Sequence, residues 1–348
     1  MTTASFIQAM PKVEPNVQLD GAMPTKTLLM IAEQNEIAES LKHFDDWVRL
    51  VSEPEYPRIY EIARMACSWL KHPDDLTRVV YDLGTSLAKQ NVRYAEIGVN
   101  PVQYPDLDLS YDDFLSAIND GRDRARRAWG IEIGWVFMIP REEPRRADEL
   151  ARWTSTASAR RGGVVALGVS GDENAQPVGQ FERAFHTVEK KEIGRVARAG
   201  DTQGVEGVLK AIEVLHPHRL IDGRGAAESP EALTAIVENQ VTLAVSPTRA
   251  AKQRWVASTA EYPLRKLIDN GVSVIIGSDM ASLYHTSLHE EYTVVVDQCG
   301  LSPEELETLA LNAVQKSFLP DEAKAEMVKT FTEAYAALRA EHIEPANA

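Results

Sequence analysis

Short hydrophobic segments recur along the chain and alternate with segments of helical periodicity. Several hydrophobic segments are almost continuous, which is typical of parallel strands covered on both faces. The segments between them have the spacing of amphipathic helices, most clearly at 111–129, 143–160, 203–215 and 230–239. We expect strands at 12–18, 92–99, 131–139, 164–169, 192–197, 219–221, 242–245 and 272–276.

Eight strands that alternate with helices predict an α/β fold, a (β/α)8 TIM barrel. Two regions add to it. Residues 24–85 form a helical excursion after the first strand, with a helix at 58–70, and residues 303–341 form two C-terminal helices, the second opened by Pro320. There is no internal repeat and no low-complexity linker, so we expect residues 1–348 to form one domain.

Acidic residues outnumber basic ones, 52 against 37, which gives a formal net charge of −15. Without a prominent basic patch, we expect neither a nucleic-acid nor an anionic-membrane partner. Cys67 and Cys299 are far apart and have neither disulfide-framework nor metal-site spacing. No apolar run approaches 18 residues, so we expect a cytoplasmic protein. Oligomeric state stays open.

The segment PKVEPNVQLDGAMPTKTL (11–28) resembles the opening motif of the adenosine deaminase family. In that family a strand ends in two histidines one residue apart, followed by Leu-Asp-Gly-Ala. Residues two apart on a strand face the same side, so such a pair can hold one metal ion. In this chain the two positions are Asn16 and Gln18, and neutral amides are poor zinc ligands.

The resemblance continues through an ordered series of motifs at 91–101, 164–173, 195–201, 219–230, 275–292 and 311–319. It implies an amidohydrolase-like barrel over roughly residues 6–328. Several family functional positions differ. The arginine of the second strand is Gly98, a zinc-binding histidine is Arg198, and the catalytic glutamate is Asp201. A second catalytic histidine is Asp222, and a substrate-contacting aspartate is Met280.

The resemblance therefore implies a divergent member that lacks most zinc ligands. A catalytic zinc needs about three protein ligands and an open position, but the chain keeps only Asp279 of the family's four. Arg198 adds a permanent cation that would repel the metal. We expect no metal cofactor, and no deamination by the family's mechanism, which needs metal-activated water.

By resemblance, the altered residues converge on one pocket at the carboxyl ends of the strands. The expected substrate contacts are Asn16, Gln18, Asp20, Gly171, Arg198, Asp279, Met280 and Tyr284. We expect Arg198 to pair with Asp279 and Asp222, because buried carboxylates need a cation. Crowded carboxylates push one pKa upward, so Asp201 and Asp222 are candidate proton-transfer groups, with His285 as a third.

Three functional hypotheses remain open. The first is a metal-independent enzyme that uses acid–base chemistry for hydrolysis, elimination, cyclisation or isomerisation of a small polar molecule, with nucleoside derivatives among the candidates. The second is a catalytically inactive protein that binds a ligand or regulates a partner. The third is a zinc hydrolase with a relocated metal held by His285, Asp279 and Asp222.

Overall fold

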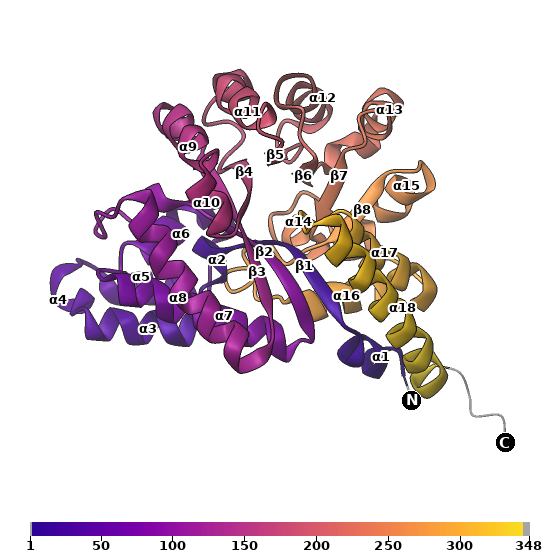
Figure 1. Cartoon of the computed structure of the whole chain (residues 1–348), viewed down its shortest axis with the longest axis horizontal. Helices are drawn as coiled ribbons and strands as arrows, with labels where there is room; N and C mark the ends of the chain where they lie inside the picture. The colour runs from indigo at the N-terminus through magenta and orange to yellow at the C-terminus, as the bar shows by residue number, and fades with distance from the viewer. Residues whose placement is uncertain (1, 344–348) are drawn as a thin grey trace.

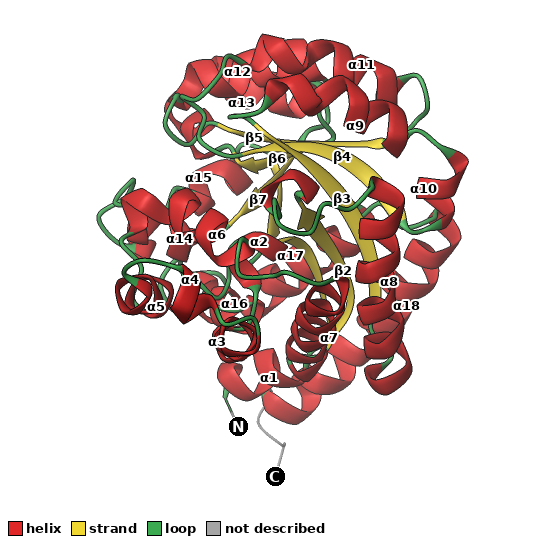
Figure 2. Cartoon of the chain, turned by 90° about the vertical axis from the view of Figure 1, so that its left-hand side faces the viewer, coloured by secondary structure: helices red, strands yellow, loops and turns green. Residues whose placement is uncertain are grey.

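A barrel of eight parallel strands forms the centre of the molecule. The computed structural model describes residues 2–343, so the predicted domain limits 1 and 348 lie outside the described residues. The strands follow one another around the barrel in chain order, with helices outside them (Figures 1 and 2). They are β1 (Lys12–Gln18), β2 (Val92–Val99), β3 (Glu132–Pro140), β4 (Val164–Ser170), β5 (Gly194–Ala199), β6 (Arg219–Asp222), β7 (Thr242–Val245) and β8 (Ser273–Ile276). The predicted (β/α)8 fold is confirmed.

The helices fall into three groups. Those between β1 and β2 are α2 (Leu19–Ala22), α3 (Thr25–Gln34), α4 (Ile37–Ser40), α5 (Phe44–Ser52), α6 (Ile59–Cys67) and α7 (Pro73–Lys89). Those outside the later strands are α8 (Tyr111–Trp129), α9 (Ala147–Thr154), α10 (Ala157–Arg161), α11 (Glu182–Glu189), α12 (Gly204–Leu215), α13 (Pro230–Glu238), α14 (Pro247–Lys252), α15 (Leu264–Asp269) and α16 (Leu288–Asp297). The terminal helices are α1 (Thr3–Ala9), α17 (Pro303–Gln315) and α18 (Asp321–His342).

Most predicted bounds lie within two residues of the observed ones, and two of the differences have a clear local cause. The helix expected at 143–160 is divided into α9 and α10, because the Thr156 hydroxyl accepts a hydrogen bond from Ala159 N and caps a new helix. The fifth strand begins two residues later than expected, at Gly194. Glu192 has a left-handed backbone (φ 56°), which ends the preceding turn and cannot belong to a strand.

The barrel closes where β1 meets β8. Gln18 N donates to Asp279 O at 2.9 Å, and Asp279 N donates to Asn16 O at 2.9 Å. Buried Glu14 reinforces this seam, because its carboxyl accepts the Ser278 hydroxyl at 2.6 Å and Asn16 N at 3.0 Å. The seam thus fixes the first and last strands at the end of the barrel where TIM-barrel enzymes carry their chemistry.

The barrel interior is packed rather than hollow. Its middle is apolar and consists of Val136, Met138, Ala166, Val196 and Ile221. Below this layer the buried Arg219 guanidinium pairs with Glu96 at 2.6 Å and lies over the Phe318 ring. A packed floor leaves the carboxyl ends of the strands as the place for a site.

Of the terminal helices, α1 and α18 pack together at the opposite end of the barrel. Phe6 of α1 contacts Tyr335 of α18 with ring centroids 6.5 Å apart, and the Tyr335 hydroxyl donates to Pro11 O at 2.7 Å.

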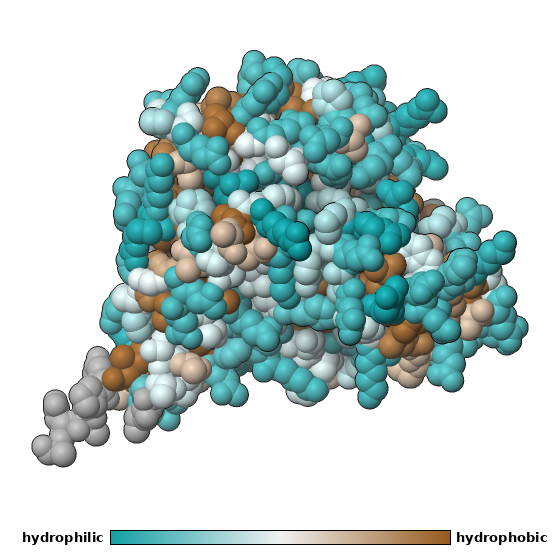
Figure 3. Space-filling view, turned by 180° about the vertical axis from the view of Figure 1, so that it is seen from behind, coloured by the Kyte–Doolittle hydropathy of each residue, from teal (hydrophilic) through white to brown (hydrophobic). Residues whose placement is uncertain are grey.

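The face in Figure 3 is mostly hydrophilic, with hydrophobic residues in small separate groups. None of the helices within residues 2–343 is long and apolar enough to span a membrane.

Glu291 on α16 generates a prediction about stability. Its fully buried carboxyl accepts the Thr286 hydroxyl at 2.9 Å and Thr248 N at 3.3 Å, and burial raises its pKa to about 7. A raised carboxyl pKa stabilises the fold fully below the unfolded pKa of 4.5, and this stabilisation is lost as the pH rises towards 7.

We therefore expect Glu291→Gln to flatten the decline of the unfolding free energy between pH 4.5 and 7, where one such group contributes a slope of about 1.4 kcal/mol per pH unit. Urea unfolding across this range measures it. Glu290→Gln, which changes an exposed carboxylate on the same helix, is the control. An unchanged slope in Glu291→Gln would contradict the prediction.

Candidate active site

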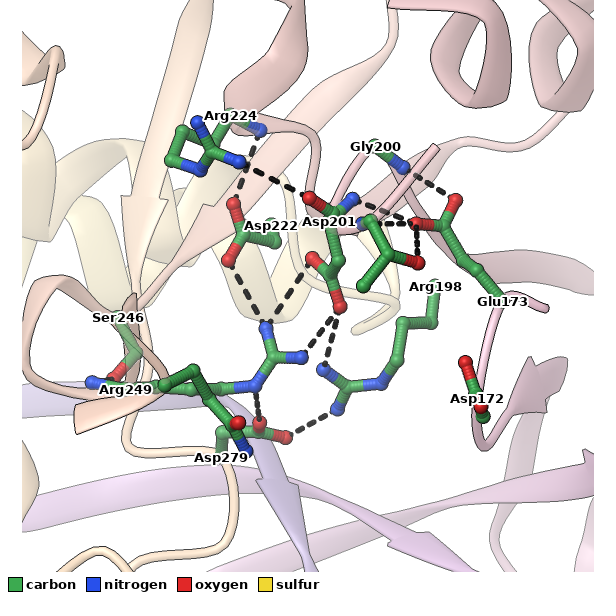
Figure 4. A network of polar contacts seen from close by, with 12 residues as sticks. Asp172, Glu173, Arg198, Gly200, Asp201, Asp222, Arg224, Ser246, Arg249 and Asp279 are labelled. Atoms are coloured by element: carbon green, nitrogen blue, oxygen red, sulfur yellow. Dashed lines mark hydrogen bonds and ion pairs between the residues drawn. The ribbon is translucent and has the colours of Figure 1, made fainter. Parts of the chain in front are cut away.

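Five charged side chains form a buried ion cluster at the carboxyl ends of β5 to β8 (Figure 4). None is more than 5% exposed. Arg198 lies on β5, Asp201 follows it, Asp222 ends β6, Arg249 lies on α14 after β7, and Asp279 follows β8. We call these five residues the ion cluster.

Arg249 is the centre of the ion cluster. Its Nη2 is 2.5 Å from Asp201 Oδ2, and its Nη1 is 3.0 Å from Asp222 Oδ2. Its Nε is 3.0 Å from Asp279 Oδ2. One guanidinium therefore contacts all three carboxylates. The side chain is fixed from the other side by the Trp255 ring, 4.4 Å from the guanidinium carbon.

Arg198 is the second cation of the ion cluster. Its Nη2 donates to Asp279 Oδ1 at 2.6 Å, and its Nη1 is 3.7 Å from Asp201 Oδ2. The expected pair with Asp279 is confirmed, whereas the expected pair of Arg198 with Asp222 is wrong. Asp222 pairs with Arg249, because the helix after β7 places that residue next to the end of β6.

The carboxylates of Asp201 and Asp222 differ in acidity. Burial would raise the pKa of Asp201, but Arg249 and Arg198 together outweigh burial and lower it. Burial, followed by repulsion from Asp201, raises the pKa of Asp222 to about 7 despite the contact with Arg249. One carboxyl is thus held ionised, while its neighbour can change its protonation near neutral pH.

Backbone hydrogen bonds and left-handed backbone angles hold these aspartates in place. Glu173, 2% exposed, accepts Gly200 N at 2.7 Å, Asp201 N at 2.8 Å and Thr202 N at 2.8 Å, which fixes the turn after β5. Asp222 and Asp279 both have left-handed backbones, with φ of 74° and 51°. Such conformations cost free energy outside glycine and persist only where the surroundings impose them.

The two amides of β1 lie at the same end of the barrel. Gln18 Nε2 donates to Asn16 Oδ1 at 3.1 Å, and both residues are 5% exposed. The Gln18 side chain lies against Gly98 of β2. A Cβ at position 98 would be only 2.2 Å from Gln18 Oε1, so the absence of a side chain there makes room for the glutamine.

The other expected contact residues are also buried around this end of the barrel. Asp20 accepts the Tyr104 hydroxyl at 3.2 Å, and burial raises its pKa to about 7. Gly171 has a φ of 93°, a conformation that disfavours any side chain, and it faces the Glu142 carboxylate. Met280 packs on Gly21.

Side chains from segments distant in sequence pack together beside the ion cluster. Tyr284 is 1% exposed, and its ring stacks on Tyr56 from the helical excursion, with centroids 5.9 Å apart. Gln253 Nε2 donates to both Tyr56 O at 3.0 Å and the Tyr284 hydroxyl at 2.9 Å. The ion cluster is therefore enclosed, which strengthens every charge interaction within it.

His285 does not join the ion cluster. Its side chain is exposed on the loop after β8 and forms no ion pair within residues 2–343. No group of three or more His, Cys, Asp or Glu residues in the described part of the chain is placed to hold a metal ion. The structure therefore does not assemble His285, Asp279 and Asp222 as a relocated zinc site.

The side chains at the family's zinc positions do not fit zinc. Asn16 and Gln18 are amides that hydrogen-bond each other, and Arg198 brings a guanidinium within 2.6 Å of Asp279. Asp279 also has Arg249 at 3.0 Å, so both of its oxygens face cations. Zinc requires several thiolate, imidazole or carboxylate donors in one tetrahedral arrangement, and this set has one such donor.

Comparisons with known proteins agree with the fold. The adenosine deaminase family model matches residues 11–334. An aminodeoxyfutalosine deaminase from Streptomyces coelicolor is 28% identical over 96% of this chain and 87% of that protein. An adenosine deaminase from Clostridium acetobutylicum is 26% identical over 92% of this chain and 96% of that protein. An amidohydrolase from Burkholderia ambifaria, solved with bound Zn, has a TM-score of 0.89 at 24% identity and covers 98% of this chain and 95% of that one.

The ion cluster predicts a large effect of removing its central cation. Arg249→Met would leave three buried carboxylates with one guanidinium, and such losses typically cost about 3–5 kcal/mol of unfolding free energy. Adding Asp222→Asn should recover part of that loss, because the two residues share one interaction.

Urea unfolding of the two single variants and the double variant measures this coupling. Arg254→Met, a change of an exposed arginine two residues after α14, should leave stability nearly unchanged. Additive effects of Arg249→Met and Asp222→Asn would mean that the two side chains do not form the observed pair.

Proposed function

The chain belongs to the adenosine deaminase family, and we propose that it is a zinc-independent member that acts on a small polar molecule at its barrel mouth. The observation that carries this proposal is the ion cluster, in which Arg198 and Arg249 occupy the surroundings of the one retained zinc-ligand position, Asp279. Guanidinium groups neutralise carboxylates, but they cannot take part in metal-based activation of water.

Proton transfer in the proposed reaction falls to Asp222. Its pKa of about 7 lets it donate or accept a proton at neutral pH. Asp201 stays ionised beside Arg249 and Arg198 and stabilises positive charge on the substrate. This pair suits hydrolysis, elimination, cyclisation or isomerisation, each of which needs at least one proton transfer to or from the substrate or water.

The proposed substrate class is nucleoside-derived. The relatives are named as deaminases of adenosine and aminodeoxyfutalosine, and the chain retains Asp20 and Gly171 at family ligand positions. Met280 replaces a family aspartate and packs on Gly21, so any base would be held by other groups. The strained backbones of Asp222 and Asp279 also support a retained site, since such strain clusters at functional positions.

A catalytically inactive ligand-binding protein is the second candidate, and one observation favours it. Every oxygen of Asp222 already has a partner: Arg249 contacts Oδ2, while Arg224 N and the Tyr262 hydroxyl donate to Oδ1 at 3.0 and 3.3 Å. A proton-transfer group must exchange one of these contacts for the substrate.

Metal content tests the proposed independence from zinc. We expect the purified protein to contain far less than one zinc per chain, and to leave adenosine unconverted with or without chelator. Elemental analysis and an inosine assay measure both. About one zinc per chain, lost in Asp279→Ala, would overturn the proposal.

Turnover separates the enzyme from the inactive protein. Nucleosides and nucleobases that raise the melting temperature of the wild type are incubated with wild type, Asp222→Asn and Asp172→Asn, and products are detected by mass spectrometry. For an enzyme, Asp222→Asn should still be stabilised by the compound but turn it over at least about 100-fold more slowly. Asp172→Asn, which changes an exposed aspartate near the mouth, should retain turnover. Binding without conversion by wild type would favour the inactive protein.

A further inference from the structure

Asn100 is a buried amide without a partner at the mouth of the barrel. It follows the last residue of β2 and is 1% exposed. Neither its Oδ1 nor its Nδ2 has a hydrogen-bond partner within residues 2–343. Buried side-chain amides are normally bonded, and each polar group left unpaired costs about 1–3 kcal/mol. The amide therefore needs an explanation.

Capping of the following turn, the usual role of an asparagine at this position, does not explain the buried amide. Asn100 precedes the 3₁₀ turn η2 (Pro101–Gln103), at the position where an asparagine side chain commonly caps the turn. Its side chain forms no capping bond, and only its backbone carbonyl accepts Gln103 N, at 3.0 Å. The side-chain amide is thus not used to stabilise the turn.

The direction of the amide follows from the alternation of β2. Alternate residues of a strand face the same side. Glu96 reaches Arg219 of β6 inside the barrel, and the Cα–Cβ direction of Gly98 points at the Gln18 side chain. The backbone stays extended at Asn100 (φ −123°, ψ 89°), so its side chain continues this inward row above Gln18.

A second amide belongs to the same turn. Gln103 Oε1 is also buried without a hydrogen-bond partner in the described part of the chain. The β1–β2 side of the mouth therefore carries the amides of Asn16, Gln18, Asn100 and Gln103, whereas the ion cluster occupies the β5–β8 side. The amide side carries neutral donors and acceptors, which suit a neutral, planar group of a ligand.

We propose that Asn100 is a specificity-determining residue that hydrogen-bonds a ligand edge with a donor beside an acceptor. This inference rests on the proposed function and adds which side chain recognises the ligand. Asparagine makes a bidentate contact of this kind with the amino group and the adjacent ring nitrogen of adenine. Oδ1 accepts from the amino group, and Nδ2 donates to the ring nitrogen.

The first test uses the unliganded protein. Asn100→Leu keeps the approximate size of the side chain and removes both unpaired polar atoms, so we expect no loss of stability in urea unfolding. Asn35→Leu is the matched control, because the Asn35 amide donates to Trp69 O at 2.9 Å and Asp75 Oδ2 at 2.8 Å. A loss in Asn100→Leu as large as that in Asn35→Leu would show that the amide has a structural role and would overturn the proposal.

The second test measures binding of adenine and of purine, which lacks the amino group, by calorimetry. We expect the wild type to prefer adenine by at least about fivefold, the lower limit for one bidentate contact. In Asn100→Leu this preference should disappear. If the wild type binds adenine no better than purine, or if the variant keeps the preference, the proposal is wrong.

The two proposals can fail separately. Zinc-dependent deamination would contradict the proposed function, but it would leave the adenine preference and its loss in Asn100→Leu unaffected. A zinc-free protein that keeps its adenine preference in Asn100→Leu would contradict only the assignment of Asn100.

Discussion

The contact of one buried guanidinium with three carboxylates is the interaction on which the site depends. Arg249 reaches Asp201, Asp222 and Asp279, which come from three different strand ends. Three carboxylates could not be enclosed together without cations, because their desolvation and mutual repulsion would exceed what packing supplies. In this fold a metal with two positive charges could supply that compensation, and here two arginines supply it. The two arginines therefore compensate the charge of all three buried acids.

In the proposed zinc-independent site, the arginines change the chemistry that the barrel can support. A guanidinium carries a fixed charge and fixed N–H directions, so it positions and stabilises anions, but it offers no open coordination position. Proton transfer must then come from a side chain. In the proposed reaction the ion cluster also determines which carboxyl transfers the proton. Two cations lower the pKa of Asp201, whereas Asp222 shares Arg249 and is repelled by Asp201. Because the two chemically identical carboxyls share the same cations unequally, their pKa values move in opposite directions.

More of the fold than of the site could be predicted from the sequence. The largely apolar segments at 92–99 and 242–245 gave β2 and β7 with their observed bounds, because burial on both faces leaves a strong local signal. Arg249 was missed. It lies on a short helix, 27 residues from Asp222 and 48 from Asp201, and no local pattern indicates which distant carboxylates an arginine will meet. Glu173 was missed for the same reason, since its partners are backbone N–H groups rather than a recognisable side-chain motif.

The two sides of the mouth suggest a division of roles that neither side could fulfil alone. On the β5–β8 side, every carboxylate of the ion cluster has a guanidinium partner, so the charges compensate one another and do not require a ligand. On the β1–β2 side, Asn100 and Gln103 keep buried polar atoms without partners, and such atoms gain most from a ligand that replaces the water they lost on folding. Recognition by neutral hydrogen bonds would then be separate from proton transfer by charged groups. Under the proposed function, such a separation lets the barrel bind a neutral planar molecule through the amides while the arginines compensate the buried acids.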